Sequence, residues 1–265
     1  MKFSEKFFWF FLGLSFLSAY VIATQNPLHL NSIPEWQPPS SEYILGVGEN
    51  GLNLFRAVIE ASFQSIILAV CVSFLSIFIG TILSGIMFLL GGRSEKVFGD
   101  ILNFLDSFPV LIVYLTLGLI VSNNLWGLVL VLSCFSWVHY SRFVRSFLIE
   151  LRHRDFVTAA KAMGLKPSRI FFKHLLPQFI ERFPVMFLVG CRSVVLTESV
   201  LSFLGFGMAT GDRISLGSLI FTGQRAIFKA PHAVLVPAVS LALLLLILQS
   251  LVARFQTLLS APETS

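Results

Sequence analysis

The chain has 265 residues, of which 55% are hydrophobic and only 12% are charged, and its formal net charge is +5 at pH 7. A soluble domain carries about 25% charged residues, so this chain has too little polar surface to enclose a water-soluble globule. The composition excludes a soluble enzyme and a disordered chain and indicates a membrane protein. The cysteines are odd in number and far apart in apolar sequence, which favours packing roles over disulfides or a metal site: Cys71, Cys134 and Cys191.

Six stretches are apolar and long enough to cross a bilayer, since a membrane helix needs about 20 such residues. The stretches do not alternate polar with apolar residues, which excludes lipid-facing strands. Only residues 122–124 separate the third stretch from the fourth, so these two should form a tight hairpin. We therefore predict an all-α polytopic membrane protein with six transmembrane helices, at Phe7–Thr24, Ser65–Leu90, Ile101–Val121, Leu125–Val144, Phe183–Leu204 and Ala233–Val252.

The first stretch follows two lysines and has two interpretations. It resembles a signal peptide with a weak cleavage site at residues 21–23, but its apolar core exceeds the usual length of about 7–15 residues. We favour a retained anchor helix over residues 1–24. The remaining organisation is then an external segment at 25–59, a transmembrane core at 60–256 with a cytoplasmic loop at 148–178, and a cytoplasmic tail at 257–265.

The basic residues indicate the orientation of the chain. Nine of the 19 Lys and Arg residues lie in one segment, Arg142 to Arg182. Cytoplasmic loops carry an excess of Lys and Arg, so this segment should be cytoplasmic and both termini should lie on the same side. The positive net charge is therefore an orientation signal and does not indicate nucleic-acid binding.

The basic segment has the pattern of a helix, a sharp turn and a second helix. Asp155 is expected to cap the first helix, and Gly164 stands where a left-handed residue would end it. Pro167 can occupy the first position of a second helix, and Pro177 is expected to end that helix. The spacing i, i+3, i+4 and i+7 places four apolar side chains on one face of the first helix: Phe156, Ala159, Ala160 and Met163.

This hairpin has two interpretations. An amphipathic hairpin can rest on lipid headgroups. The alanines make its apolar face shallow, however, which favours insertion into a groove on another protein. No glycine in the chain is followed by lysine, so no phosphate-binding loop of the form G-x-x-x-x-G-K-[ST] is present. The sequence also lacks H-E-x-x-H, C-x-x-C and G-x-S-x-G motifs, so the chain is not expected to be an enzyme.

Four segments resemble the permeases of ABC importers. Ala159-Ala160, Gly164 and Leu176-Pro177 resemble the "EAA" loop, and residues 101–119 are similar to the Asp-x-x-Pro span of dipeptide, oligopeptide and nickel permeases. ESVLSFLGFG, residues 198–207, is similar to the Glu-x-x-Leu-Ser-Phe-Leu-Gly motif of the same group, and residues 45–55 weakly resemble the segment before the second span of those permeases. The resemblance covers roughly Leu45 to Phe255 and is to the second permease subunit.

The resemblance implies a type I ABC-importer permease fold and a subunit that imports peptides or a related small solute, nickel included. It implies a homologous second permease, two ATPase subunits that bind ATP and Mg, an external solute-binding protein and surrounding lipid as partners, with no cofactor on this chain. The loop would dock the ATPase through Asp155, Phe156, Ala159, Ala160, Met163, Gly164, Leu176 and Pro177. Four features depart from the family pattern: Thr158 replaces a Glu, residues 48–51 lack the usual Asp-Glu and Arg-Asp pairs, Leu216 replaces a Trp, and the C-terminal end lacks a Gly-Asp pair.

Ionisable residues in membrane spans are costly and should face the bundle interior or a partner. Asp106, near the cytoplasmic end of the third span, either lines a path or pairs with a basic neighbour. Glu198 either gates the outer end or packs helices, and Arg192, six residues before it, faces another way. We expect the candidates for the translocation path or gate to be Asp106, Pro109, Glu198, Ser202 and Gly205.

Two other features remain open at this level. Ser76, Gly80 and Ser84 recur every fourth residue and indicate close helix packing, either within the subunit or between subunits. The alternative functions are a secondary ion-coupled carrier that uses Asp106 and Glu198, and a membrane scaffold that does not transport. A carrier would transport alone on an ion gradient, whereas an importer permease requires an ATPase.

Overall fold

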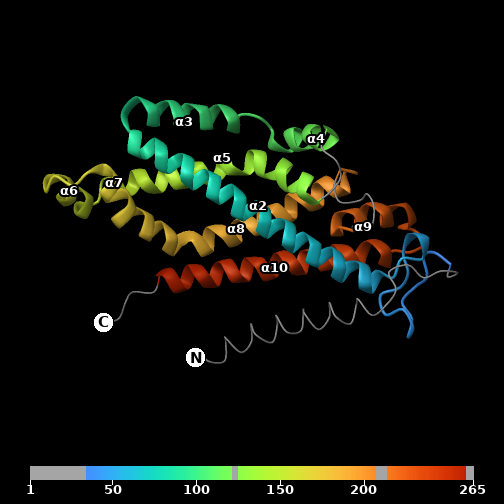
Figure 1. The fold of residues 1–265 in the computed structure, drawn as a ribbon. Coiled ribbons are helices and arrows are strands. Elements are labelled where there is room, and N and C mark those ends of the chain that lie inside the picture. Colours follow the sequence, from blue (N-terminus) through green and yellow to red (C-terminus); the bar gives the residue numbers. More distant parts are fainter. Residues whose placement is uncertain (1–33, 121–124, 207–213, 261–265) are drawn as a thin grey trace. The chain divides into compact units, whose positions relative to one another are not determined.

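The computed structural model describes residues 34–120, 125–206 and 214–260, and these are mostly helical (Figure 1). Within these ranges the only extended pairing is an isolated bridge between Val47 and Asn53, so the all-α prediction is confirmed. The chain divides into two compact units. The first unit comprises Met1–Ile67 and Thr197–Leu245, and the second comprises Leu68–Leu196 and Leu246–Ser265.

Among the described residues, four helical stretches are long and apolar enough to cross a membrane. They are α2 (Leu54–Leu90), α5 (Leu125–Arg152), the stretch Pro167–Phe203 that includes α8 (Leu176–Phe203), and α10 (His232–Ser260). Each corresponds to a predicted span and is longer than the apolar run that predicted it. The predicted first span and the predicted hairpin turn at 122–124 lie outside the described residues.

The predicted third span is not a single helix. Helix α3 (Gly92–Asp106) and helix α4 (Val110–Ile120) are bent by 73° at the break between them, and the pair counts as a fifth span only if taken together. Pro109 causes the break, because proline has no N–H to continue the ladder and disfavours helical backbone at Phe108 before it. The span predicted over Ile101–Val121 is therefore divided at Pro109, where a kink is expected, into parts of two helices.

Helix α2 begins eleven residues before the predicted Ser65. Its first turns are polar, so hydropathy alone does not reveal them. The Asn53 side chain accepts a hydrogen bond from the Arg56 amide at 3.4 Å, as an N-terminal cap does. Arg56 also pairs with Glu60 at 3.7 Å, and Gln64 donates to Glu60 at 3.3 Å. These i, i+4 contacts stabilise the added turns.

In the second unit, α3 and α4 lie along α5 (Figure 1). The stripe of small residues on α2 also packs here. The Ser84 hydroxyl donates to the Ser141 carbonyl at 2.9 Å, and a Cβ on Gly80 would lie 2.9 Å from the Ser141 nitrogen. The stripe therefore makes a helix contact within the subunit.

The first unit contains η1 (Glu49–Gly51), α9 (Leu216–Gly223) and η3 (Gln224–Ala226) besides the ends of the long helices. A Ser215–Ser218 capping box begins α9, because the hydroxyl oxygen of each serine accepts a hydrogen bond from the backbone N–H of the other. One buried cluster of this unit consists of Leu54, Ala226, Ala230 and Ala233, with Trp36 and Leu45 packed against them.

Candidate functional site

The segment 148–178, called the elbow here, is a short helical hairpin at the end of α5. It contains α6 (Asp155–Ala162), α7 (Pro167–Ile170) and the π-helical turn η2 (Phe171–Leu175). It packs against the rest of the second unit through a buried cluster of residues from α2, α5, the elbow and α8. The elbow members of this cluster are Leu148, Leu151, Val157, Ala160, Ile170, Phe171 and Leu175.

The sharp turn between α6 and α7 forms as predicted. Gly164 has a φ of +78°, the left-handed conformation that glycine adopts without strain. The Leu165 amide donates to the Ala160 carbonyl at 3.1 Å, and the Gly164 amide donates to the Lys161 carbonyl at 2.9 Å. This pair of bonds is a Schellman motif. Pro167 then begins α7, so the helix–turn–helix prediction is confirmed.

Two details of the predicted hairpin are wrong. Arg154 is the N-cap of α6, with extended backbone and no side-chain cap, and Asp155 is already helical in the first turn. There its charge still interacts favourably with the helix dipole. Pro177 does not end a helix, because α8 continues through it. The π turn before it, closed by the Leu176 amide on the Phe171 carbonyl, widens the helix and accommodates a residue without an N–H.

The predicted apolar face of α6 is divided between two sides. Ala160 is buried and packs inward with Val157. Phe156 and Met163 are 38% and 73% exposed, and Ala159 is exposed as well. The prediction that these four residues form one apolar face is therefore wrong. The outward side still presents apolar groups, and we call Phe156, Ala159 and Met163 the outer face of the elbow.

Basic side chains are also exposed on the elbow. Lys161, Lys166, Arg169 and Lys173 are all exposed on the elbow. Arg154 is paired with Glu150 at 2.9 Å, four residues before it. A segment that exposes both apolar and basic side chains suits a protein partner that offers an apolar groove and acidic residues.

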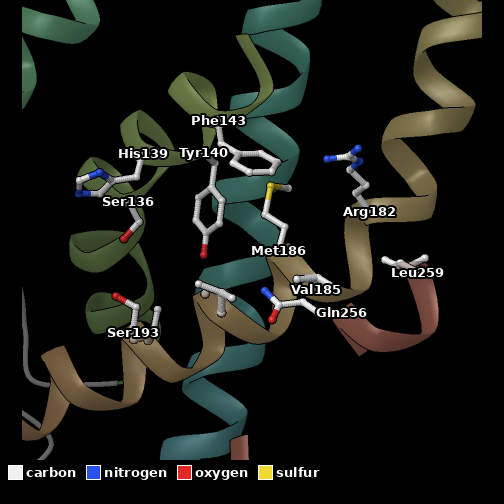
Figure 2. A pocket seen from close by; sticks show the side chains of 13 residues that line it. Ser136, His139, Tyr140, Phe143, Arg182, Val185, Met186, Ser193, Gln256 and Leu259 are labelled. Carbon is white, nitrogen blue, oxygen red and sulfur yellow. The ribbon is translucent and has the colours of Figure 1, made fainter. Parts of the chain in front are cut away.

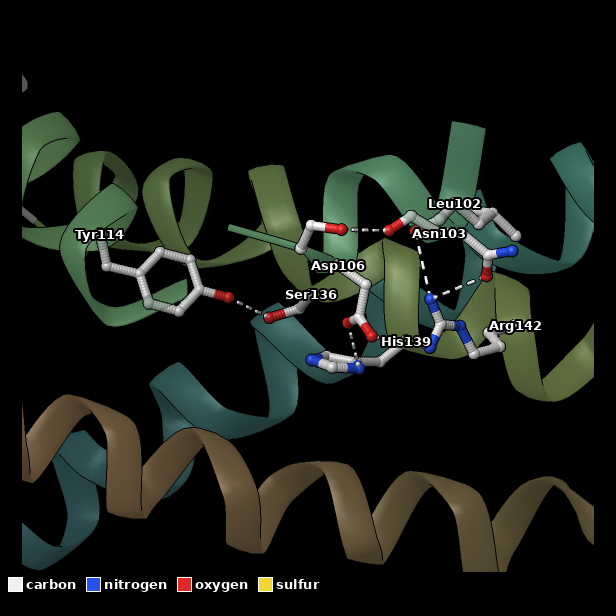
Figure 3. Close-up of polar contacts among 8 residues, drawn as sticks. Leu102, Asn103, Asp106, Tyr114, Ser136, His139 and Arg142 are labelled. Atoms are coloured by element: carbon white, nitrogen blue, oxygen red, sulfur yellow. Dashed lines mark hydrogen bonds and ion pairs between the residues drawn. The ribbon is translucent and has the colours of Figure 1, made fainter. Parts of the chain in front are cut away.

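Asp106 lies at the break between α3 and α4, in a polar cluster with α5 (Figure 3). Arg142 donates to its carboxylate at 2.7 Å and to the Leu102 carbonyl and the Asn103 side chain at 3.2 and 3.4 Å. His139 lies 3.8 Å from the same carboxylate. The prediction that Asp106 pairs with a basic neighbour is confirmed, and Arg142 also caps the end of α3.

Glu198 is buried near the end of α8, with 1% of its surface exposed. Ser202, also fully buried, donates to its carboxylate at 2.6 Å, and Ser65 of α2 donates at 3.4 Å. The carboxylate thus joins the end of α8 to α2 within the first unit. Arg192 points elsewhere and donates to Gln249 of α10, as its six-residue separation from Glu198 predicts.

Two glycines near Glu198 have clear backbone roles. Gly205 has a φ of +87°, and the bonds from Phe206 to Leu201 and from Gly205 to Ser202 form a second Schellman motif that ends α8. Gly217 lies where α9 meets α8, and a Cβ there would be 2.1 Å from the Ser199 carbonyl. A larger residue at Gly217 would push α9 away from the Glu198 cluster.

The sequence alone does not reveal a cavity of about 790 Å³ in the second unit, bounded by α5, α8 and the end of α10 (Figure 2). Its polar lining is Ser136, His139, Tyr140, Arg182, Ser193 and Gln256. Arg182 was identifiable as one more basic residue, but no local pattern links it to helices far away in sequence. Among the described residues, no group of three or more His, Cys, Asp or Glu side chains is placed to hold a metal.

Residues 74–261 match the family described as binding-protein-dependent transport system inner membrane component. The oligopeptide transport system permease protein OppC of Mycobacterium tuberculosis H37Rv is 32% identical over 241 residues, which are 88% of this chain and 82% of that protein. The dipeptide permease protein DppC of Lactococcus lactis is 28% identical over 78% of this chain and 60% of its own length.

The fold is similar to that of a solved membrane protein. A chain from a structure of the MetNI methionine ABC transporter in an inward-facing conformation superposes with a TM-score of 0.60, covering 77% of this chain and 97% of that chain. The sequence identity is 16%, so this likeness supports the fold alone. It agrees with the type I permease fold expected from the sequence.

Proposed function

The chain belongs to the family of binding-protein-dependent transport system inner membrane components and is a multi-pass permease of an ABC importer, and we propose that it transports a peptide or a related small solute. The support for a peptide is that the most similar relatives described above are named oligopeptide and dipeptide permeases. We further propose that this subunit works with a homologous permease, two ATPase subunits that carry ATP and Mg, and an external solute-binding protein.

The observation that carries the coupling role is the outer face of the elbow. Three apolar side chains on one short helix point away from the core, while the opposite side is anchored through Val157 and Ala160. A rigid helix with an apolar outer side can enter a groove of another protein. We propose that this groove belongs to the ATPase, and that nucleotide-driven closure of the ATPases moves the elbow and with it α5 and α8.

The elbow and both termini should then lie in the cytoplasm, as the excess of basic residues supports. The other candidate residues contribute to the gate in two different ways. Asp106 and Pro109 would form a hinge where the third span bends. Glu198, Ser202 and Gly205 would hold the outer end of α8 closed by packing, since Glu198 and Ser202 are buried and have no room for a solute.

Coupling is tested with the purified complex of two permeases and two ATPases in lipid vesicles with its solute-binding protein. Met163→Asp places a charge on the outer face and should reduce solute-stimulated ATP hydrolysis and uptake at least about tenfold, because a buried unpaired charge is costly in an interface. Leu90→Asp is the matched control. Leu90 is 64% exposed at the end of α2, outside the elbow, so this variant should retain coupling.

The turn offers a second test of the same proposal. Gly164→Val forces a branched side chain into the left-handed region and should uncouple the complex, whereas Gly164→Asn tolerates that region and should retain coupling. A Cβ at this position meets no atom within 4 Å, so the difference between the variants reports backbone conformation. Wild-type coupling in both Met163→Asp and Gly164→Val would contradict docking through the elbow. Gradient-driven uptake without the ATPase would indicate a carrier instead.

A further inference from the structure

The cavity between α5, α8 and α10 has an unusual distribution of charge for a membrane-spanning unit. Two of its lining residues carry or can acquire positive charge, Arg182 and His139, and no Asp or Glu lines it. Figure 2 shows these two side chains on opposite sides of the cavity, with Tyr140 and Met186 between them. The remaining walls are mainly apolar.

Arg182 is the cation whose charge is not neutralised. Its guanidinium lies 4.9 Å from the centre of the Phe147 ring, which orients it without balancing its charge. Within the part of the chain that the structure describes, Arg182 forms no ion pair. His139 differs, because it lies beside Asp106, whose carboxylate already receives a 2.7 Å hydrogen bond from Arg142.

The polar lining argues against a surface facing lipid. Exposed positions on the α2 part of the same unit are uniformly apolar, namely Phe74, Phe78, Ile82 and Ile86. The cavity instead combines an arginine with the side chains of Ser193 and Gln256. Arg182 ends the basic segment that we predict to be cytoplasmic, so it lies at the cytoplasmic end of this lining. Ser193 lies within the predicted span Phe183–Leu204, where polar side chains face a bundle interior or a water-filled path. The lining of α8 from Arg182 to Val194 extends about 18 Å along the helix, roughly half the membrane thickness.

We propose that this cavity is a station for the transported solute and that Arg182 binds a carboxylate group of that solute. The inference rests on the proposed peptide-importing function and specifies how the permease would recognise its cargo. Every unmodified peptide has a C-terminal carboxylate, and a guanidinium binds carboxylates through two parallel hydrogen bonds. The apolar walls, with flexible Met186 among them, would accept side chains of different shape.

The test uses the complete permease–ATPase complex in lipid nanodiscs and a tripeptide that carries a photoreactive benzoylphenylalanine. The peptide is supplied either with a free C-terminal carboxylate or as its C-terminal amide. We expect the free acid to label residues of α8 about tenfold more than the amide, because a charge-assisted hydrogen bond contributes about 1.5 kcal/mol or more. Arg182→Gln should reduce labelling by the free acid to the level of the amide.

Two further variants make the result specific. Arg182→Lys retains the charge and should retain a preference for the free acid. Labelling of Arg182→Gln by the amide at the wild-type level would exclude misfolding as the cause of its loss of acid labelling. Arg93→Gln removes an exposed positive charge of α3 that does not line the cavity and should label like the wild type. Equal labelling by acid and amide in the wild type, or unchanged labelling in Arg182→Gln, would overturn the proposal.

Uptake of the same peptide by wild-type complex with its binding protein is measured separately. If ATP-driven uptake occurs but labelling does not depend on Arg182, the cavity inference fails and the proposed function stands. If no uptake of any peptide occurs, the proposed function fails. A photoreactive anionic lipid provides the last arm. Arg182-dependent labelling by that lipid, without labelling by the peptide, would assign the cavity to lipid and overturn the proposal.

Discussion

At the scale of single residues, the most unusual setting is that of Glu198. A carboxylate with 1% exposure is surrounded by serine hydroxyls, with Ser65 and Ser202 donating to it and no cation paired with it among the described residues. Close packing adds to this, since Gly217 leaves no space for a Cβ beside Ser199. A group so enclosed contributes through its hydrogen bonds, and this distinguishes it from a residue that meets the solute.

Substitution of Glu198 separates a packing role from a transport role. Glu198→Ala leaves two buried hydroxyls without their acceptor and should destabilise the purified protein by about 2–3 kcal/mol, seen as a lower midpoint of unfolding in detergent. Glu198→Gln keeps an acceptor of similar shape and should remain close to the wild type in stability and uptake. A Gln variant that is stable but does not transport would show that the charge itself acts in the gate.

Several residue-level predictions hold because the residue type alone restricts the backbone. Gly164 adopts a positive φ, and Pro167 starts a helix, whatever surrounds them. Asp155 and Pro177 were mispredicted because their effects depend on neighbours. The backbone of Arg154 is extended, so Arg154 occupies the N-cap position of α6. The π turn before Pro177 allows the helix to continue through that proline. The inward and outward sides of α6 depend on where α5 lies, which no local pattern specifies.

At the scale of elements, the break between α3 and α4 is the feature that distinguishes this span from the others. Arg142 of α5 binds the Asp106 carboxylate and the Leu102 carbonyl of α3 together (Figure 3). Tyr114 of α4 reaches the same helix, with its hydroxyl 3.0 Å from that of Ser136. Helix α5 therefore holds both halves of the broken span, and the free segment between them is short.

Loss of Arg142 should loosen this break. Arg142→Ala removes a half-exposed ion pair and the cap of α3, a contribution of about 1 kcal/mol, so hydrogen–deuterium exchange over residues 104–112 should accelerate about fivefold. Lys96→Ala removes an exposed charge of α3 outside the cluster and should leave exchange unchanged. Equal exchange in the Arg142 variant and the wild type would show that Pro109 alone maintains the bend.

Helices were predictable where the apolar run and the helix cover the same residues, and less so where the helix extends beyond the apolar run. The apolar runs located α2, α5, α8 and α10 because a bilayer requires about 20 such residues. Their ends were misplaced because polar turns, such as those with Arg56 and Glu60, add helix beyond the apolar run. The cavity was not predictable, since its lining comes from three helices that only tertiary packing brings together.

At the scale of the whole molecule, one helical stretch carries residues of the proposed ATPase-docking elbow and of the proposed solute cavity. Pro167–Phe203 begins in the elbow, passes Arg182 and includes Glu198. A displacement of the elbow would therefore be transmitted along one helical stretch to the cavity lining and the buried carboxylate, without a separate signalling path. This continuity is a physical basis for coupling a cytoplasmic ATPase to a gate.

The orientation of the chain gives the last prediction. Between Met163 and Phe228, the residues that the structure describes form one spanning stretch and α9, whose eight residues extend only about 12 Å and cannot cross a bilayer of about 30 Å. The two residues should therefore lie on opposite sides of the membrane. Both are accessible, since Met163 is 73% and Phe228 is 101% exposed. In a chain without its three natural cysteines, an impermeant maleimide should label Phe228→Cys in intact cells. Met163→Cys should react only in inside-out vesicles washed free of peripheral proteins, and labelling of both from one side would refute the topology on which cytoplasmic docking depends.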